Sequence, residues 1–111
     1  MEAAVSFRRQ TSGRGADQYQ KNAILNASPE ELILKLYDLI IVSIKKEDYR
    51  KANLALSELI SSLNFDYKEV SLGFFRLYRY CQDCLYKQKP EEPLRIIREL
   101  RDSWAQAFSL L

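Results

Sequence analysis

The sequence predicts an all-α protein, an antiparallel up-down four-helix bundle with a flexible N-terminal arm or strap. The chain has 111 residues but only three glycines and three prolines, so breaks in regular structure are few. Apolar residues recur at spacings of three and four in four segments, which is the period of an amphipathic helix. Short breaks separate these segments, and helices joined by short connections pack as antiparallel neighbours.

The N-terminal segment differs in character from the rest of the chain. Residues 1–17 are polar and lack sustained periodicity, which predicts a disordered arm. Residues 18–111 are predicted to form a single helical-bundle domain, because this length supports one core. Between residues 16 and 25 we expect a short helix or an extended strap, whose apolar side chains are Tyr19, Ile24 and Leu25.

The first long helix is predicted from Pro29 to Lys46 and opens with a capping box. Ser28 can accept a hydrogen bond from the N–H of Glu31, whose carboxylate reaches back to the N–H of Ser28. Pro29 suits the first helical position. The polar positions between residues 32 and 44 are only Lys35, Asp38 and Ser43. A helix that is apolar on nearly all sides is expected to be buried on more than one side. Because a chain this short has little protein to cover all of these sides, we interpret the excess apolar surface as a binding surface for a partner.

The second and third helices are predicted from their caps and their apolar stripes. Asp48 is the expected N-cap of the second helix, and Asp66 with Glu69 is the expected cap of the third. The stripe of the second helix consists of Tyr49, Ala52, Leu56, Leu59 and Leu63, with Ile60 beside it. The third helix has two stripes, one of Val70, Phe74, Leu77, Cys81 and Cys84 and one of Phe75, Tyr78 and Leu85.

The fourth helix follows a clear stop signal. Lysines near the last carbonyls and then Pro90 are expected to end the third helix. Glu91, Glu92 and Pro93 suit the first turn of the next helix. The apolar stripe predicted for this helix consists of Ile97, Leu100, Trp104, Ala107 and Leu111.

Composition argues against most chemistry. The chain has no histidine, the commonest general base and metal ligand, so we expect no catalytic residue, no metal site and no cofactor. Cys81 and Cys84 lie in mid-helix and are expected to be buried thiols; a redox or metal role for the pair is a third reading. A net charge of +2 does not predict nucleic-acid binding. Without a signal peptide or a bilayer-spanning run, the expected location is the cytoplasm, with no membrane insertion.

Several blocks of the sequence resemble the flagellar secretion chaperone FliS family. The N-terminal blocks are Tyr19-Gln20, Ala27-Ser28-Pro29-Glu30-Glu31-Leu32 and Leu36-Tyr37-Asp38. They are followed, in the family's order, by Asp48-Tyr49, Lys51-Ala52-Asn53, Leu77-Tyr78-Arg79-Tyr80, Leu100-Arg101-Asp102, Trp104 and Ala107. The chain departs from the family in having Leu39 where a glycine is common. Its stretch between Asp38 and Asp48 is also shorter than in the family by about two helical turns. This predicts that any binding groove formed between these helices is shorter as well.

The resemblance implies a cytoplasmic export chaperone. Such a protein binds the disordered C-terminal segment of flagellin, prevents premature polymerisation and delivers the subunit to the flagellar type III secretion apparatus, including its export-gate components. In the family an N-terminal strap covers part of the groove, which implies a gating or client-contact role for the strap residues; capping the bundle core is an equal alternative. The predicted client-binding residues are Tyr19, Ile24, Leu25, Leu32, Leu36, Ile40, Leu56, Ile60 and Leu63.

An alternative function stays open. A structural helical bundle could use the same apolar surface to self-associate as a tight symmetric dimer. A chaperone, by contrast, is expected to be a monomer or a weak homodimer when its client is absent.

Overall fold

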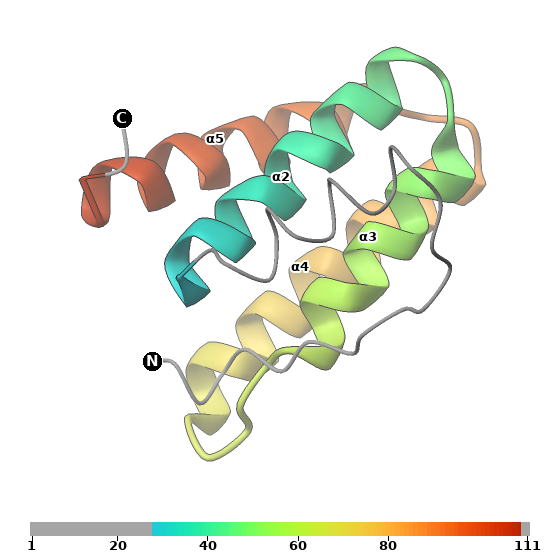
Figure 1. Cartoon of the computed structure of the whole chain (residues 1–111). Helices are drawn as coiled ribbons and strands as arrows, with labels where there is room; N and C mark the ends of the chain where they lie inside the picture. The colour runs from blue at the N-terminus through green and yellow to red at the C-terminus, as the bar shows by residue number, and fades with distance from the viewer. Residues whose placement is uncertain (1–27, 110–111) are drawn as a thin grey trace, which may run out of the picture.

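Four helices connected in series make up the computed structural model, which describes residues 28–109 (Figure 1). They are α2 (Pro29–Lys45), α3 (Tyr49–Ser61), α4 (Lys68–Tyr86) and α5 (Glu91–Ala107). Both α2 and α4 pack against α3 and α5, so α2 and α4 are diagonal neighbours in the bundle. The described residues contain no strand, and the prediction of an all-α four-helix bundle is confirmed. The predicted arm and the strap residues Tyr19, Ile24 and Leu25 lie outside the described residues.

The predicted caps of α2 and α3 are confirmed. The Oγ atom of Ser28 accepts a hydrogen bond from the N–H of Glu31 at 3.2 Å, and the Ser28 N–H donates to Glu31 Oε1 at 3.1 Å. This backbone donor also holds the pKa of Glu31 below its ordinary value. At the start of α3, Asp48 Oδ1 accepts from the N–H of Lys51 at 3.1 Å. Local hydrogen bonds therefore define where both helices begin.

Two tight turns reverse the chain after α2 and after α4. Glu47 has φ 59° and Gln88 has φ 63°, both in the left-handed region. In the turn after α2, the N–H of Asp48 donates to the carbonyl of Ser43 at 2.8 Å. In the turn after α4, the N–H of Lys89 donates in the same way to the carbonyl of Cys84 at 2.9 Å. This pattern is the Schellman motif, which satisfies the last carbonyls of a helix. It sets each following helix antiparallel to the one before.

The predicted cap of α4 is wrong. The N-cap is Tyr67, and no side chain bonds to the first turn of α4. Asp66 instead donates its backbone N–H to Asn64 Oδ1 at 2.9 Å, in an Asx turn that ends before the helix begins. Asn64 also accepts, through its carbonyl oxygen, a hydrogen bond from the hydroxyl of Ser71. The connection is therefore organised by Asn64, and α4 starts one residue later than an Asp66 cap requires.

The core runs along the axis of the bundle and contains residues from all four helices. Its largest fully buried side chains are Tyr37, Ile40, Leu56, Leu59, Cys81, Leu85, Pro93 and Ile97. The predicted stripe of α3 is confirmed, because Ala52, Leu56 and Leu59 are all buried. The predicted stripe of α5 is confirmed at Ile97, whereas Ala107 is exposed.

The face that α4 turns to the core differs from the first predicted stripe. Ser71, Tyr78, Cys81 and Leu85 are its buried residues, whereas Val70 is 57% exposed. The core face therefore combines members of both predicted stripes and includes a serine. Cys81 and Cys84 are free thiols, as expected; Cys81 is buried and Cys84 is only partly so.

The helices do not stay equally close along their length. In Figure 1 the ribbons of α5 and α4 separate toward the end where α2 begins. At this end α2 and α4 start, and α3 and α5 finish. Within residues 28–109, no helix combines the length and the apolar character needed to cross a membrane.

Candidate functional site

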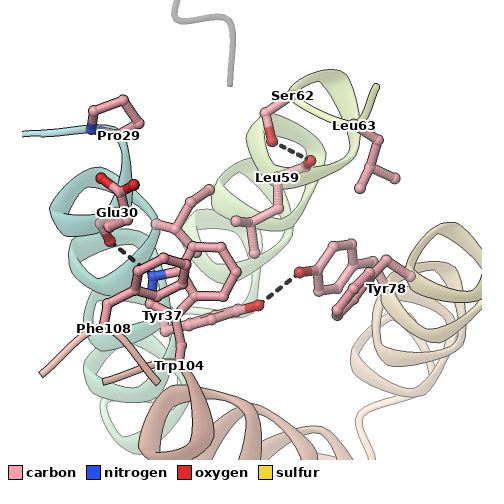
Figure 2. Close-up of a pocket in the computed structure, with 11 residues that line it drawn as sticks. Pro29, Glu30, Tyr37, Leu59, Ser62, Leu63, Tyr78, Trp104 and Phe108 are labelled. Atoms are coloured by element: carbon pink, nitrogen blue, oxygen red, sulfur yellow. Dashed lines mark hydrogen bonds between the residues drawn. The ribbon is translucent and has the colours of Figure 1, made fainter. Parts of the chain in front are cut away.

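The open end of the bundle contains an apolar pocket to which all four helices contribute (Figure 2). Its interior space is about 50 Å³, a few times the ~10–15 Å³ that one ordered water requires. This space suits the end of one or two side chains, not a large ligand. The lining residues are Pro29, Glu30, Ile33, Tyr37, Leu59, Ser62, Leu63, Phe74, Tyr78, Trp104 and Phe108. We call this the terminal pocket.

Trp104 fixes one wall of the terminal pocket. Its Nε1–H donates to the backbone carbonyl of Glu30 at 2.9 Å, which ties the last turn of α5 to the first turn of α2. The indole meets the ring of Tyr37 edge-on, with centroids 6.5 Å apart, and lies 4.9 Å from the ring of Phe108. Phe108 is 39% exposed and forms the outer part of the wall. Aromatic rings so arranged give the pocket a rigid side.

The floor of the terminal pocket is a pair of buried tyrosines. The hydroxyls of Tyr37 and Tyr78 are 2.7 Å apart and join α2 to α4 across the bundle (Figure 2). Phe74 stacks on Tyr78 with ring centroids 5.7 Å apart. Because one hydroxyl donates to the other, the accepting hydroxyl keeps a proton of its own to donate. The floor is thus apolar except for one polar pair.

Buried phenol and thiol groups at and near the floor of the pocket are held in their neutral forms. Burial raises the pKa of Tyr37 to about 12, and it raises the pKa of Tyr78 further, with the nearby Tyr37 adding to the effect. Burial also raises the pKa of the Cys81 thiol to about 12. A thiol that stays protonated at neutral pH is a poor nucleophile. Within residues 28–109, no three His, Cys, Asp or Glu side chains are grouped so that they could hold a metal ion.

The structure divides the predicted client-binding residues. Leu63 lines the terminal pocket, Ile60 is partly buried against the core, and Leu32 is partly exposed on α2. Leu36, Ile40 and Leu56 belong to the core, with exposures of 8%, 0% and 0%. Neighbouring helices cover all three side chains, so they do not line an open groove in this structure, and their part in client binding stays a prediction.

Most of the pocket residues were missed by reasoning from periodicity. Trp104, Phe74 and Tyr78 were read as members of core stripes, and Phe108 was not singled out at all. One feature of the sequence could have identified them. These aromatic residues lie near helix ends, and in an antiparallel bundle those ends meet at the same end of the bundle. Whether such a ring is covered depends on how far the helices diverge, and the period of a stripe carries no information about that.

Residues from separate resemblance blocks meet in the structure. Arg101 donates through Nε to Asp38 Oδ1 at 2.8 Å, linking α5 to α2. The Tyr37–Tyr78 and Trp104–Glu30 hydrogen bonds described above also join one block to another. These blocks, distant in sequence, therefore form connected contacts around the terminal pocket.

Comparison of the chain with family models, with curated proteins and with solved structures yields no match.

Proposed function

We propose that this protein is a cytoplasmic export chaperone that binds the disordered C-terminal segment of flagellin. It would prevent premature polymerisation and deliver the subunit to the flagellar type III secretion apparatus. The observation that carries the proposal is the terminal pocket, in which apolar side chains from all four helices line an opening at one end of the core. An amphipathic client helix buries its apolar side chains in an opening of this kind.

Exposed apolar residues outside the pocket favour a client with an extended apolar face. Leu39 and Val42 of α2 are 37% and 46% exposed, one helical turn apart. They account for part of the apolar excess of this helix. A disordered segment that folds on binding can wrap over separate patches of this kind.

The client's identity comes from the sequence resemblance. Within the fold, Asp38, Tyr37 and Trp104 each bond to a residue of another block of the resemblance. The strap residues Tyr19, Ile24 and Leu25 are proposed to gate client access, since their segment precedes Pro29, which lines the terminal pocket.

Titration of a peptide covering the flagellin C-terminal segment into the full chain tests this function. We expect one-to-one binding by calorimetry, a gain of helicity by circular dichroism and a negative heat-capacity change. Phe108→Asp should weaken binding at least tenfold, which is about 1.4 kcal/mol. Phe65→Asp is the matched control, because Phe65 is 49% exposed and does not line the terminal pocket.

Two results would reject the proposal. One is absence of binding by the folded wild type, and the other is equal binding by the Phe108→Asp variant. Light scattering of the free chain separates the chaperone from a self-associating structural bundle. A tight dimer that the peptide cannot dissociate would favour the structural bundle.

A further inference from the structure

A second surface feature lies between α3 and α4. Two adjoining depressions there share Asn53 of α3 and Tyr86 of α4. Neither residue lines the terminal pocket. We call these depressions together the α3–α4 groove.

A hydrogen-bond network holds one guanidinium of the groove in place. Gln82 Nε2 donates to the backbone carbonyl of Asn53 at 3.1 Å and to Ser57 Oγ at 2.9 Å. Its amide oxygen accepts from Arg79 Nη1 at 3.0 Å. Both ends of the Gln82 amide are therefore engaged, and Arg79 is oriented by only one of its five N–H donors.

The α3–α4 groove carries unneutralised positive charge. Among residues 28–109, no carboxylate lies within 4.0 Å of the side-chain nitrogens of Arg79 or of Arg50, which also lines the groove. The acidic side chain of the groove, Asp83, is paired with Lys87 at 3.1 Å. An oriented guanidinium with free donors matches the two oxygens of a carboxylate.

Exposed apolar side chains flank these polar groups. Tyr86 is 84% exposed and Leu54 is 55% exposed, and both line the groove. Tyrosine and arginine are enriched at protein–protein contacts, where aromatic surface and bidentate hydrogen bonds act together. The groove thus combines a cationic and an apolar element.

We propose that the α3–α4 groove binds an acidic segment of a partner protein. In this complex an Asp or Glu carboxylate of the segment pairs with Arg79. A large apolar side chain of the segment packs between Leu54 and Tyr86. The site is separate from the terminal pocket and does not depend on the client proposed for it.

Selection of a random displayed-peptide library on the immobilised full chain tests this site. We expect enriched peptides to carry Asp or Glu beside a large apolar residue. A synthetic copy of an enriched peptide should bind the wild type and lose at least tenfold in affinity to Arg79→Glu. Arg76→Glu is the matched control, because Arg76 is exposed on the same helix but lines neither depression.

A second variant separates binding from folding. Tyr86→Ser removes a ring that is 84% exposed and lines both depressions, so it should leave thermal stability unchanged while it weakens the same peptide severalfold. The proposal is overturned if selection enriches no acidic peptides. It is also overturned if the enriched peptide binds Arg79→Glu and Tyr86→Ser as tightly as the wild type.

Discussion

Tyr37 and Tyr78 place their hydroxyls 2.7 Å apart in the interior of the bundle, with exposures of 1% and 3%. This hydrogen bond links the two diagonal helices, α2 and α4, which otherwise contact α3 and α5. This hydrogen bond is the polar contact in the otherwise apolar floor of the terminal pocket. It therefore fixes the orientation of α2 and α4 relative to each other at the pocket.

A double-mutant cycle on this pair should show strong coupling. Tyr37→Phe leaves the hydroxyl of Tyr78 buried without a partner, which should cost about 1–3 kcal/mol. The double change to phenylalanine removes both polar groups, so it should cost less than the sum of the single changes. Urea denaturation of the four proteins measures the cycle. Additive losses would show that the hydroxyls do not interact in solution.

Stability should fall in alkaline solution. In the unfolded chain Tyr37 ionises near its ordinary pKa of 10, whereas in the folded protein its pKa is raised to about 12 by burial. Between these values the unfolded state binds fewer protons, so the free energy of unfolding decreases as pH rises. The contribution of Tyr37 is therefore complete below about pH 10 and is lost as pH rises toward about 12. Denaturation curves at several pH values measure this slope.

A double variant is the control for this pH dependence. Replacing Tyr37 and Tyr78 together by phenylalanine removes two of the ionising groups responsible, so the free energy of unfolding should decrease less steeply above pH 10. The Cys81 thiol, whose pKa is also raised to about 12, should leave a residual slope. An unchanged slope in the double variant would contradict the assignment.

Ile40→Asp should unfold the protein. Ile40 is fully buried, and an unpaired buried carboxylate costs several kcal/mol, a large part of the roughly 5–15 kcal/mol of a typical domain. Circular dichroism should show loss of helix. Val42→Asp is the control on the same helix, because Val42 is 46% exposed and should tolerate the charge. A folded Ile40→Asp protein would mean that this side chain is accessible after all.

Gly73→Ala should stabilise α4. Gly73 lies within the helix, is exposed, and a methyl group added to it would meet no atom within 4 Å. Alanine is favoured over glycine in a helix interior by about 1 kcal/mol. An increase of that size in the free energy of unfolding is expected from urea denaturation. A decrease would contradict the open, helical environment of Gly73.

Much of the fold could be predicted because helix ends are determined locally. The Ser28 capping box, the Asp48 cap and the stop before Pro90 each depend on residues only a few positions apart. The start of α4 was mispredicted because the side chain of Asn64 accepts the hydrogen bond of the Asp66 N–H. An Asx turn at Asn64 and a helix cap at Asp66 have similar sequence patterns, so the local pattern alone does not decide between them.

The terminal pocket could be predicted only in part, for a physical reason. Periodicity identifies which side chains point inward, and it identified Leu56 and Leu59 of α3 as buried stripe residues correctly. It does not report how far the helices diverge, so it could not separate these core residues from Leu63 or Trp104, which line the opening. Likewise, it did not show that Ser71 would replace Val70 on the core face of α4.

The most direct test of the terminal pocket as the client site uses Trp104, the single tryptophan of the chain. Because its indole forms a wall of the pocket, binding of the flagellin peptide there should change its fluorescence. We predict a shift of the emission to shorter wavelength that saturates at one peptide per chain and follows the calorimetric binding curve. Binding detected by calorimetry with no change in Trp104 emission would contradict the account and place the client elsewhere.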